Sequence, residues 1–344
     1  MQIQQNAPLS QHSTMRLGGT AANLTEVTDR AQVAEAVSWA DQHKLPIIMI
    51  GQGSNIVWTD QGFPGLVIVN KIKHYEVYNE DDENVYITIG AGEIWDSVVE
   101  RAVASGLTGI EALSLIPGTT GATPVQNVGA YGQEISNTLV SVEAYDRQAK
   151  QLATIASADC KFGYRTSRFK TVDKEQFLIT TITLHLRRGN PLPPFYDSVQ
   201  TYFDSHQISQ PTPAQLREAV IAIRTAKLPD PAQVANNGSF FTNPIISKAE
   251  FEQLRAKHRE LGYHDTSDGR IKLSAAELIE LAGFKNMHDS ETGMATWPQQ
   301  ALVLINEHAH STADLLKFKQ KIVDRVQAMF GIALQQEPEL IGKM

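Results

Sequence analysis

The chain has 344 residues, which suggests about two domains at roughly 150 residues each, and 42% of them are hydrophobic, enough for a buried core. Its net charge of −8 argues against a general nucleic-acid binder, and its one cysteine, Cys160, excludes an intramolecular disulfide or a cysteine-ligated cluster. No stretch approaches the ~20 apolar residues of a membrane span, so we expect no membrane partner. We also expect a cytoplasmic monomer that binds no nucleic acid.

The first half of the chain alternates helical and strand patterns. A helix over 30–43 follows Thr28 or Asp29 as N-cap, and an apolar strand ends at Gly51. The charge cluster at 80–83 predicts an exposed hairpin turn. Further strands are predicted at 66–69, 85–89, 140–146 and 177–186, with a second helix at 95–104.

The last third reads as mostly helical. A helix begins at Pro213 after Thr212, and a long helix over 311–330 ends at Gly331. Ser247 with Glu250, and Ser274 with Glu277, fit the capping box. The final segment, 332–340, is strand-like. The predicted class is α+β, with a domain boundary between about 190 and 225.

Two glycine-rich loops are candidates for dinucleotide binding. Gly51, Gly53, Ser54 and Asn55 directly follow a strand, where backbone N–H groups can converge on a pyrophosphate. The third glycine of a Rossmann fingerprint is missing, and a plain tight turn is an equal alternative. The loop 117–132 allows close backbone approach to a flat ligand, with a structural loop as the alternative.

Three further motifs carry polar groups. Arg165 lies in the basic and aromatic run 164–170, which is either a packed site or a solvated edge. Ser239 lies in a polar turn before two phenylalanines, where a local hydrogen bonder is the ordinary interpretation. Glu337 and Glu339 are two positions apart near the C-terminus. The histidines have no metal-ligand spacing, so we predict no metal site.

In their order along the chain, these strings resemble the UDP-N-acetylenolpyruvoylglucosamine reductase (MurB) family of bacterial cell-wall synthesis. The resemblance spans nearly the whole chain, and the region around Tyr196 resembles the longer subtype, whose tyrosine loop closes over the substrate. The matching strings are TMRLGG at 14–19, IGQGSNIV at 50–57, IPGTTGATPVQNVGAYG at 116–132, YRTSRFK at 164–170, KLPDP at 227–231, NNGSFFTNP at 236–244, WPQQALVLIN at 297–306 and QEPEL at 336–340.

The resemblance implies the FAD-binding fold of the vanillyl-alcohol-oxidase (PCMH) type with a separate α+β substrate domain. Its implied parts are FAD subdomains at 1–70 and 71–210, a substrate domain at 215–328, and a C-terminal strand within 330–344 that returns to the second subdomain. FAD would be bound non-covalently. The implied cofactor residues are Gly51, Gly53, Ser54, Asn55, Pro117, Gly118, Thr119, Gly121, Ala122, Gln126, Asn127, Gly129 and Tyr131.

The implied reaction is the reduction of UDP-N-acetylglucosamine enolpyruvate to UDP-N-acetylmuramate. NADPH gives a hydride to the flavin, and flavin N5 passes it to the vinyl carbon of the substrate. Arg165 would bind the substrate carboxylate with its fork of donors. Glu339, when protonated, would donate a hydrogen bond, and Ser239 would protonate the α carbon.

The resemblance also implies the residues that bind the UDP part of the substrate: Tyr196, Lys227, Asn243 and Gln300. Arg224 lies one helical turn before Lys227, and a structural salt bridge and a substrate contact are equal alternatives for it.

The chain departs from the family at the tail, EPELIG, which lacks a basic residue, and no individual hydroxyl contacts to the flavin are assigned in the 117–132 loop. Rival interpretations are a flavin oxidase of the same fold, acting on a sugar or alcohol, and a non-catalytic flavin or nucleotide-sugar binding protein.

Overall fold

The structure, a computed structural model, describes residues 1–266 and 268–342. It divides into two compact units, each built from segments that are separate in the sequence. The first unit comprises Met1–Ala7, Ala21–Gln52 and Pro64–Ala226. The second unit comprises Pro8–Thr20, Gly53–Phe63 and Lys227–Met344. The predicted subdomain boundaries differ from this division and remain predictions.

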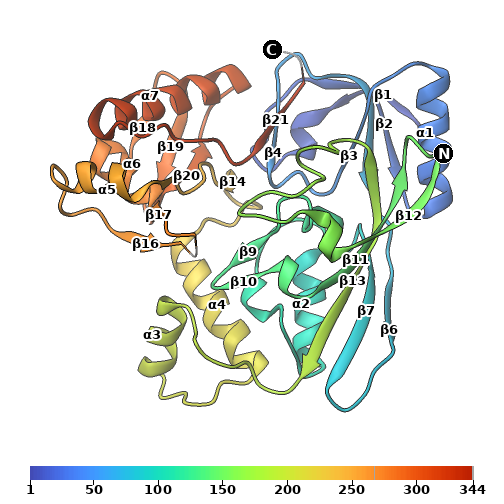
Figure 1. The fold of residues 1–344 in the computed structure, drawn as a ribbon. Coiled ribbons are helices and arrows are strands. Elements are labelled where there is room, and N and C mark those ends of the chain that lie inside the picture. Colours follow the sequence, from blue (N-terminus) through green and yellow to red (C-terminus); the bar gives the residue numbers. More distant parts are fainter. Residues whose placement is uncertain (267, 343–344) are drawn as a thin grey trace. The chain divides into compact units, whose positions relative to one another are not determined.

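One helix and a four-stranded sheet form the N-terminal part of the fold (Figure 1). Helix α1 (Arg30–Gln42) begins at Asp29, whose carboxylate accepts a hydrogen bond from the Gln32 N–H at 2.9 Å. Its apolar face packs with Ile47, Leu66 and neighbouring side chains in one buried cluster. The strands, in sheet order, are β1 (Gln4–Pro8), β2 (Thr20–Val27), β5 (Phe63–Asn70) and β3 (Ile47–Ile50).

A larger antiparallel sheet forms the body of the first unit (Figure 1). Helix α2 (Trp95–Ala104) buries Val98, Val99 and Ala102 in the core of this sheet. The predicted turn at 80–83 joins β6 and β7, as the charge cluster indicated. The strands, in sheet order, are β12 (Gln151–Ala156), β11 (Leu139–Asp146), β13 (Phe177–Arg188), β7 (Asn84–Gly90) and β6 (Tyr75–Tyr78), with β8 (Leu107–Thr108) paired to the end of β13.

Two helices complete the first unit. Helix α3 (Asp197–Ser205) and helix α4 (Pro213–Lys227) share a small apolar cluster that includes Phe203 and Leu216. At the start of α4, Thr212 Oγ1 accepts a hydrogen bond from the Gln215 N–H at 3.3 Å, as predicted for its cap.

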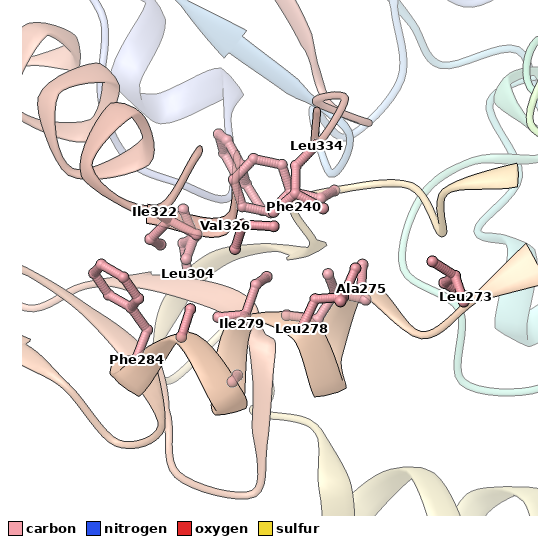
Figure 2. Close-up of a cluster of buried hydrophobic side chains, with 14 of the residues drawn as sticks. Phe240, Leu273, Ala275, Leu278, Ile279, Phe284, Leu304, Ile322, Val326 and Leu334 are labelled. Atoms are coloured by element: carbon pink, nitrogen blue, oxygen red, sulfur yellow. The ribbon is translucent and has the colours of Figure 1, made fainter. Parts of the chain in front are cut away.

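The second unit has its own apolar core, and Figure 2 shows part of it. Helix α7 (Thr312–Phe330) contributes Ile322 and Val326, and helix α6 (Ala275–Ile279) contributes Leu278. Helix α5 (Lys248–Arg255) adds Phe251. The strands form three small sheets: β14 (Ala235–Ser239), β20 (Gln300–Asn306), β19 (Met294–Trp297) and β18 (His288–Asp289); β15 (Ile245–Ile246), β17 (Ile271–Leu273) and β16 (Tyr263–Asp265); and β21 (Glu339–Ile341) with β4 (Ile56–Trp58).

The helix ends in the second unit largely follow the sequence signals. Ser311 forms a complete capping box with Asp314, and Gly331 ends α7 with a φ of +71°. The predicted box of Ser274 and Glu277 is only half formed, because the Glu277 carboxylate accepts instead from the Gly262 N–H at 2.9 Å.

The C-terminal segment differs from its predicted strand. Regular pairing is confined to Glu339–Ile341, and Gln336 makes only an isolated bridge to Phe241. The strand β21 runs parallel to β4, so its partner lies in the segment 1–70 and not in 71–210.

No helix in the described ranges has the length and apolar character needed to cross a membrane.

The remaining elements are short. The strands β9 (Gly129–Ala130) and β10 (Gln133–Glu134) pair with each other. Single helical turns occupy Leu9–His12, Glu111–Leu113, Thr120–Ala122, Ile135–Asn137, Ser157–Cys160 and Glu280–Phe284.

Candidate active site

In the first unit, Gly51 packs directly against the 117–132 loop. An ideal Cβ on Gly51 would lie 2.1 Å from Thr119 Oγ1, so only glycine allows this approach. The Gly118 N–H donates to Gln52 Oε1 at 2.9 Å, and Gly118 has a φ of +126°. The structure therefore brings Gly51 and the loop together, as expected if both serve one ligand.

The first turn of this loop is fixed against Ala91, outside the loop. An ideal Cβ on Gly121 would lie 2.5 Å from Ala91 Cβ, and the Gly121 N–H donates to the Ala91 carbonyl at 2.9 Å. Pro117 and Ala122 lie exposed on either side of this contact. Their roles in cofactor binding, and that of Gln126, remain predictions.

Asn127 is buried, and its side chain already has partners within the first unit. Its Nδ2 donates to Glu134 Oε2 at 2.7 Å and to the Gly163 carbonyl at 3.3 Å, while Oδ1 accepts from the Ser136 N–H at 3.2 Å. The amide thus ties the 117–132 loop to two neighbouring segments. A contact of Asn127 with the cofactor remains a prediction.

Arg165 lies at the tip of a tight turn beside the same loop. Gly163 and Thr166 exchange backbone hydrogen bonds of 3.1 and 3.2 Å, which leaves Arg165 at a φ of +54°. Its Nη2 donates to the Gly129 carbonyl at 2.9 Å. A non-glycine residue in this conformation is strained, and such strain is typical of functional sites.

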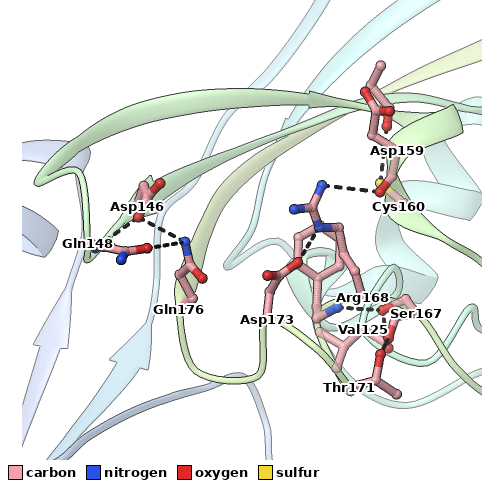
Figure 3. A network of polar contacts seen from close by, with 12 residues as sticks. Val125, Asp146, Gln148, Asp159, Cys160, Ser167, Arg168, Thr171, Asp173 and Gln176 are labelled. Carbon is pink, nitrogen blue, oxygen red and sulfur yellow. Dashed lines mark hydrogen bonds and ion pairs between the residues drawn. The ribbon is translucent and has the colours of Figure 1, made fainter.

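The residues after Arg165 anchor the turn (Figure 3). Ser167 Oγ donates to the Val125 carbonyl of the 117–132 loop at 2.6 Å, and Arg168 forms an ion pair with Asp173 at 2.5 Å. Arg168 therefore has a structural role, whereas the run as a whole is a packed segment and not a solvated edge.

A second cluster in the first unit contains Tyr131, Tyr196 and Arg224. The two tyrosine rings meet edge to face with centroids 5.7 Å apart, and the Arg224 guanidinium lies near the Tyr131 phenol. Burial raises the pKa of Tyr131, which the Arg224 charge partly offsets, and burial lowers the pKa of Arg224. Tyr131 thus lies with residues predicted for the substrate.

The salt-bridge alternative for Arg224 is not supported. The neighbouring carboxylate of Asp96 forms its ion pair with Arg217, at 2.6 Å, and accepts from the Leu115 N–H at 2.5 Å. Arg224 has no ion-pair partner in the described ranges, and its buried Nε has no hydrogen-bond partner there. A buried guanidinium with an unused donor fits an anionic ligand. Sequence reasoning missed Asp96 and Arg217, since their pairing joins two helices distant in the chain.

In the second unit, Ser239 lies at the end of a bulged strand. Two residues of β14, Asn237 and Gly238, lie opposite one residue of β20, and Gly238 has a φ of +68°. Asn236 Oδ1 accepts from the Gly238 N–H at 2.8 Å, which fixes the turn. Within the described residues, the Ser239 hydroxyl makes no hydrogen bond, so it remains available to a ligand.

Glu339, the second candidate proton donor, also belongs to the second unit, where it lies beside the segment 53–58. The strand β21 pairs with β4 so that Glu339 lies opposite Ile56, and the Glu339 N–H donates to the Asn55 carbonyl at 3.0 Å. The Asn237 amide donates to the Ser54 and Ile56 carbonyls at 3.2 Å each. The turn before Ser239 and the strand that carries Glu339 are therefore both anchored to one short segment.

Gly53 also belongs to this arrangement. It has a φ of +74°, and an ideal Cβ would lie 2.1 Å from the His12 carbonyl oxygen. Its carbonyl accepts from the Thr14 N–H at 3.2 Å. Glycine is thus required at this turn, and its role in binding a pyrophosphate remains a prediction.

The remaining substrate candidates lie on three elements. Lys227 is the last residue of α4, and Gln300 begins β20 opposite Trp297. Asn243 Oδ1 accepts from the Ala275 N–H at 3.0 Å and so caps α6, which leaves its amide donors for a ligand. Nothing in these contacts joins the three side chains to one another.

Two family models match the chain. A model described as FAD binding domain covers residues 21–154, and one described as UDP-N-acetylenolpyruvoylglucosamine reductase, C-terminal domain, covers residues 230–341. Together with the mixed helices and strands, they define an FAD-binding flavoprotein with a separate C-terminal domain, which confirms the predicted fold class.

Curated relatives match over nearly the full length. Proteins named UDP-N-acetylenolpyruvoylglucosamine reductase are 39% identical in Ralstonia nicotianae, covering 97% of this chain and 98% of the relative, and 36% identical in Pseudomonas aeruginosa, covering 99% of each. A crystal structure of the reductase (MurB) from Thermus caldophilus has a TM-score of 0.69 at 21% identity, covering 99% of both chains, and supports the fold. The chain belongs to the UDP-N-acetylenolpyruvoylglucosamine reductase family.

The residues of the structure fit FAD. At Gly51 and Gly53 an ideal Cβ would lie 2.1 Å from a neighbouring protein atom, so both positions keep the tight glycine backbone that suits the close approach of a dinucleotide. Gly51 and the 117–132 loop, which pack together in the first unit, would contribute to holding it.

Proposed function

We propose that the chain reduces UDP-N-acetylglucosamine enolpyruvate to UDP-N-acetylmuramate, an oxidoreductase step of peptidoglycan precursor synthesis that serves cell-wall growth, cell shape and division. We place it in the cytoplasm as a monomer, with NADPH as the hydride donor. FAD, when bound, supplies the two-electron hydride chemistry of this reaction.

The chain's own residues would bind the substrate and supply a proton. Arg165 would clamp the substrate carboxylate with its planar fork, where charge develops during the reaction. Glu339 would donate a hydrogen bond to that carboxylate in its protonated form. Ser239 would give its hydroxyl proton to the α carbon, a sufficiently basic centre for a hydroxyl to act as the acid.

The remaining candidates would bind the UDP part. Tyr196, Lys227, Asn243 and Gln300 would contact the pyrophosphate and nucleotide, and Arg224 would add a buried cation. The observation that carries the proposal is the Ser239 hydroxyl, which lies at a bulge anchored to the same segment as Glu339 and makes no hydrogen bond within the described residues.

The oxidase alternative needs a base to accept a proton from carbon or oxygen, whereas Ser239 and Glu339 would serve as donors. A non-catalytic binding protein would have no need for a hydroxyl held in a strand bulge. The full-length likeness to proteins named as reductases favours the reductase over both alternatives.

The first test is the purified protein's absorbance. A yellow protein with the spectrum of FAD should bleach with NADPH without oxygen and regain its colour with the enolpyruvyl substrate. In stopped flow, Ser239→Ala should be reduced by NADPH at the wild-type rate yet fail to be reoxidised by substrate. Normal reoxidation of this variant would remove Ser239 as the acid, and a colourless protein that takes up no FAD would overturn the proposal.

A further inference from the structure

Asn237 connects the turn before Ser239 to the segment 53–56. Its Nδ2 lies 3.1 Å from Thr14 Oγ1, 3.2 Å from the Ser54 carbonyl, 3.2 Å from the Ile56 carbonyl and 3.5 Å from the Gly53 carbonyl. An amide has two N–H donors, so these four oxygens share them. All of these residues belong to the second unit.

Stability alone does not explain this side chain. Asn237 is 6% exposed, and its buried Oδ1 has no donor among the described residues. An unpaired buried carbonyl costs free energy, and native proteins retain few of them. The adjacent Asn236 differs, because both ends of its amide are used: Nδ2 donates to the Val234 carbonyl and Oδ1 accepts from Gly238.

Asn236 and Asn237 place the turn before Ser239 through two different sets of contacts. Asn236 shapes the turn locally, through a bond to the residue two positions on. Asn237 fixes that turn against a segment about 180 positions earlier, the same segment that pairs with the strand carrying Glu339. The bulge makes this possible, since it turns the Asn237 side chain out of the regular ladder.

We propose that Asn237 is a positioning residue for the protonation step: its amide sets the distance between Ser239 and the 53–56 segment that also anchors Glu339. This inference rests on the proposed function of Ser239. It predicts that loss of the Asn237 amide slows proton delivery to the substrate while leaving hydride entry from NADPH intact.

The test compares Asn237→Ala with Asn306→Ala in FAD-saturated protein. Asn306 is a matched control, because it lies in the same sheet and its Nδ2 donates to the Met15 carbonyl, outside the 53–56 segment. In stopped flow, Asn237→Ala should be reduced by NADPH within about twofold of wild type and be reoxidised by substrate about tenfold more slowly or worse. Asn306→Ala should stay within about twofold in both half-reactions.

A second variant tests the connection from its other end. Thr14→Val removes one acceptor of the Asn237 amide with little change in volume, so its oxidative half-reaction should slow less than that of Asn237→Ala. The double variant should be no slower than Asn237→Ala alone, because the two residues share one interaction. This variant also decides the matter if Asn237→Ala does not fold.

Hydrogen exchange separates failure of this inference from failure of the proposed function. In Asn237→Ala, amides of residues 53–56 should exchange faster, while peptides from β13 in the first unit should be unchanged. Faster exchange supports the connection whatever reaction the protein catalyses. Unchanged exchange, or an equal slowing of both half-reactions, would overturn the role of Asn237; a wild-type protein that substrate cannot reoxidise would overturn the proposed function instead.

Discussion

At the residue scale, three non-glycine residues of the candidate site have left-handed backbones. Asn127, Tyr131 and Arg165 have φ values of +47°, +48° and +54°. The sequence indicated their polar side chains but not this conformation, because it arises from contacts distant in the chain, such as the Arg165 bond to the Gly129 carbonyl. The surrounding packing therefore holds strained residues in place, which preorganises a site.

The first prediction concerns Arg165. Arg165→Lys keeps the positive charge but loses the planar fork, so we expect kcat/KM for the enolpyruvyl substrate to fall about 10- to 100-fold. The rate of flavin reduction by NADPH serves as the control and should change little. Steady-state kinetics measures the first and stopped flow the second; an unaltered kcat/KM would exclude Arg165 from carboxylate binding.

Cys160 gives a prediction about pH. Burial raises the pKa of its thiol to about 11 from an ordinary 9.0, so the folded protein holds this proton more tightly than the unfolded chain. The resulting stability is complete below pH 9 and is lost as the pH rises toward 11, by about 1–2 kcal/mol. Urea unfolding at several pH values should show a steeper decline for wild type than for Cys160→Ala; parallel curves would contradict it.

At the element scale, local signals predicted local structure. Helices α1, α2 and α7 and strands β3 and β13 follow from periodicity and caps in the sequence. The failures involve distant partners: Glu277 bonds to Gly262 in place of its own cap, and only Glu339–Ile341 of the predicted C-terminal strand finds a partner strand. The bulge of β14 could not be predicted from the sequence either, because it depends on how β14 pairs with β20.

The cap of α7 offers a stability test. Ser311→Ala removes the hydroxyl that accepts from the Asp314 N–H at 3.1 Å, and should lower the free energy of unfolding by about 1 kcal/mol. Ser311→Asp retains an acceptor and should recover most of the loss. Denaturant unfolding of the three proteins measures this; equal stability of Ser311→Ala and wild type would count against the cap.

At the scale of the whole molecule, the division into units does not follow the chain. The second unit takes residues from three separate segments, and β21 pairs with a strand about 280 positions earlier. No hydrophobic period or turn signal encodes such a pairing, so the sequence yielded the two-part organisation but not its assignment of residues. The resemblance to a family supplied predicted roles for residues that physical reasoning alone left ambiguous.

Deletion of residues 338–344 tests this arrangement. It removes β21 with Glu339, so we expect hydrogen-exchange protection to fall at 56–58 while β13 in the first unit keeps its protection. The oxidative half-reaction should be lost together with Glu339. Retained protection at 56–58 would mean that β4 is held without its partner strand.

The pairing of β21 with β4 has a consequence for how the protein is made. The first unit ends at Ala226, whereas the second includes β21, which pairs with β4. At about 5–20 residues per second, translation from Ala226 to Glu339, 113 positions later, takes of the order of ten seconds. During that time a nascent chain can complete its first unit, whereas the strand that carries Glu339 has not yet been made and cannot pair with β4. The proposed proton-donating residues are thus completed after the first unit.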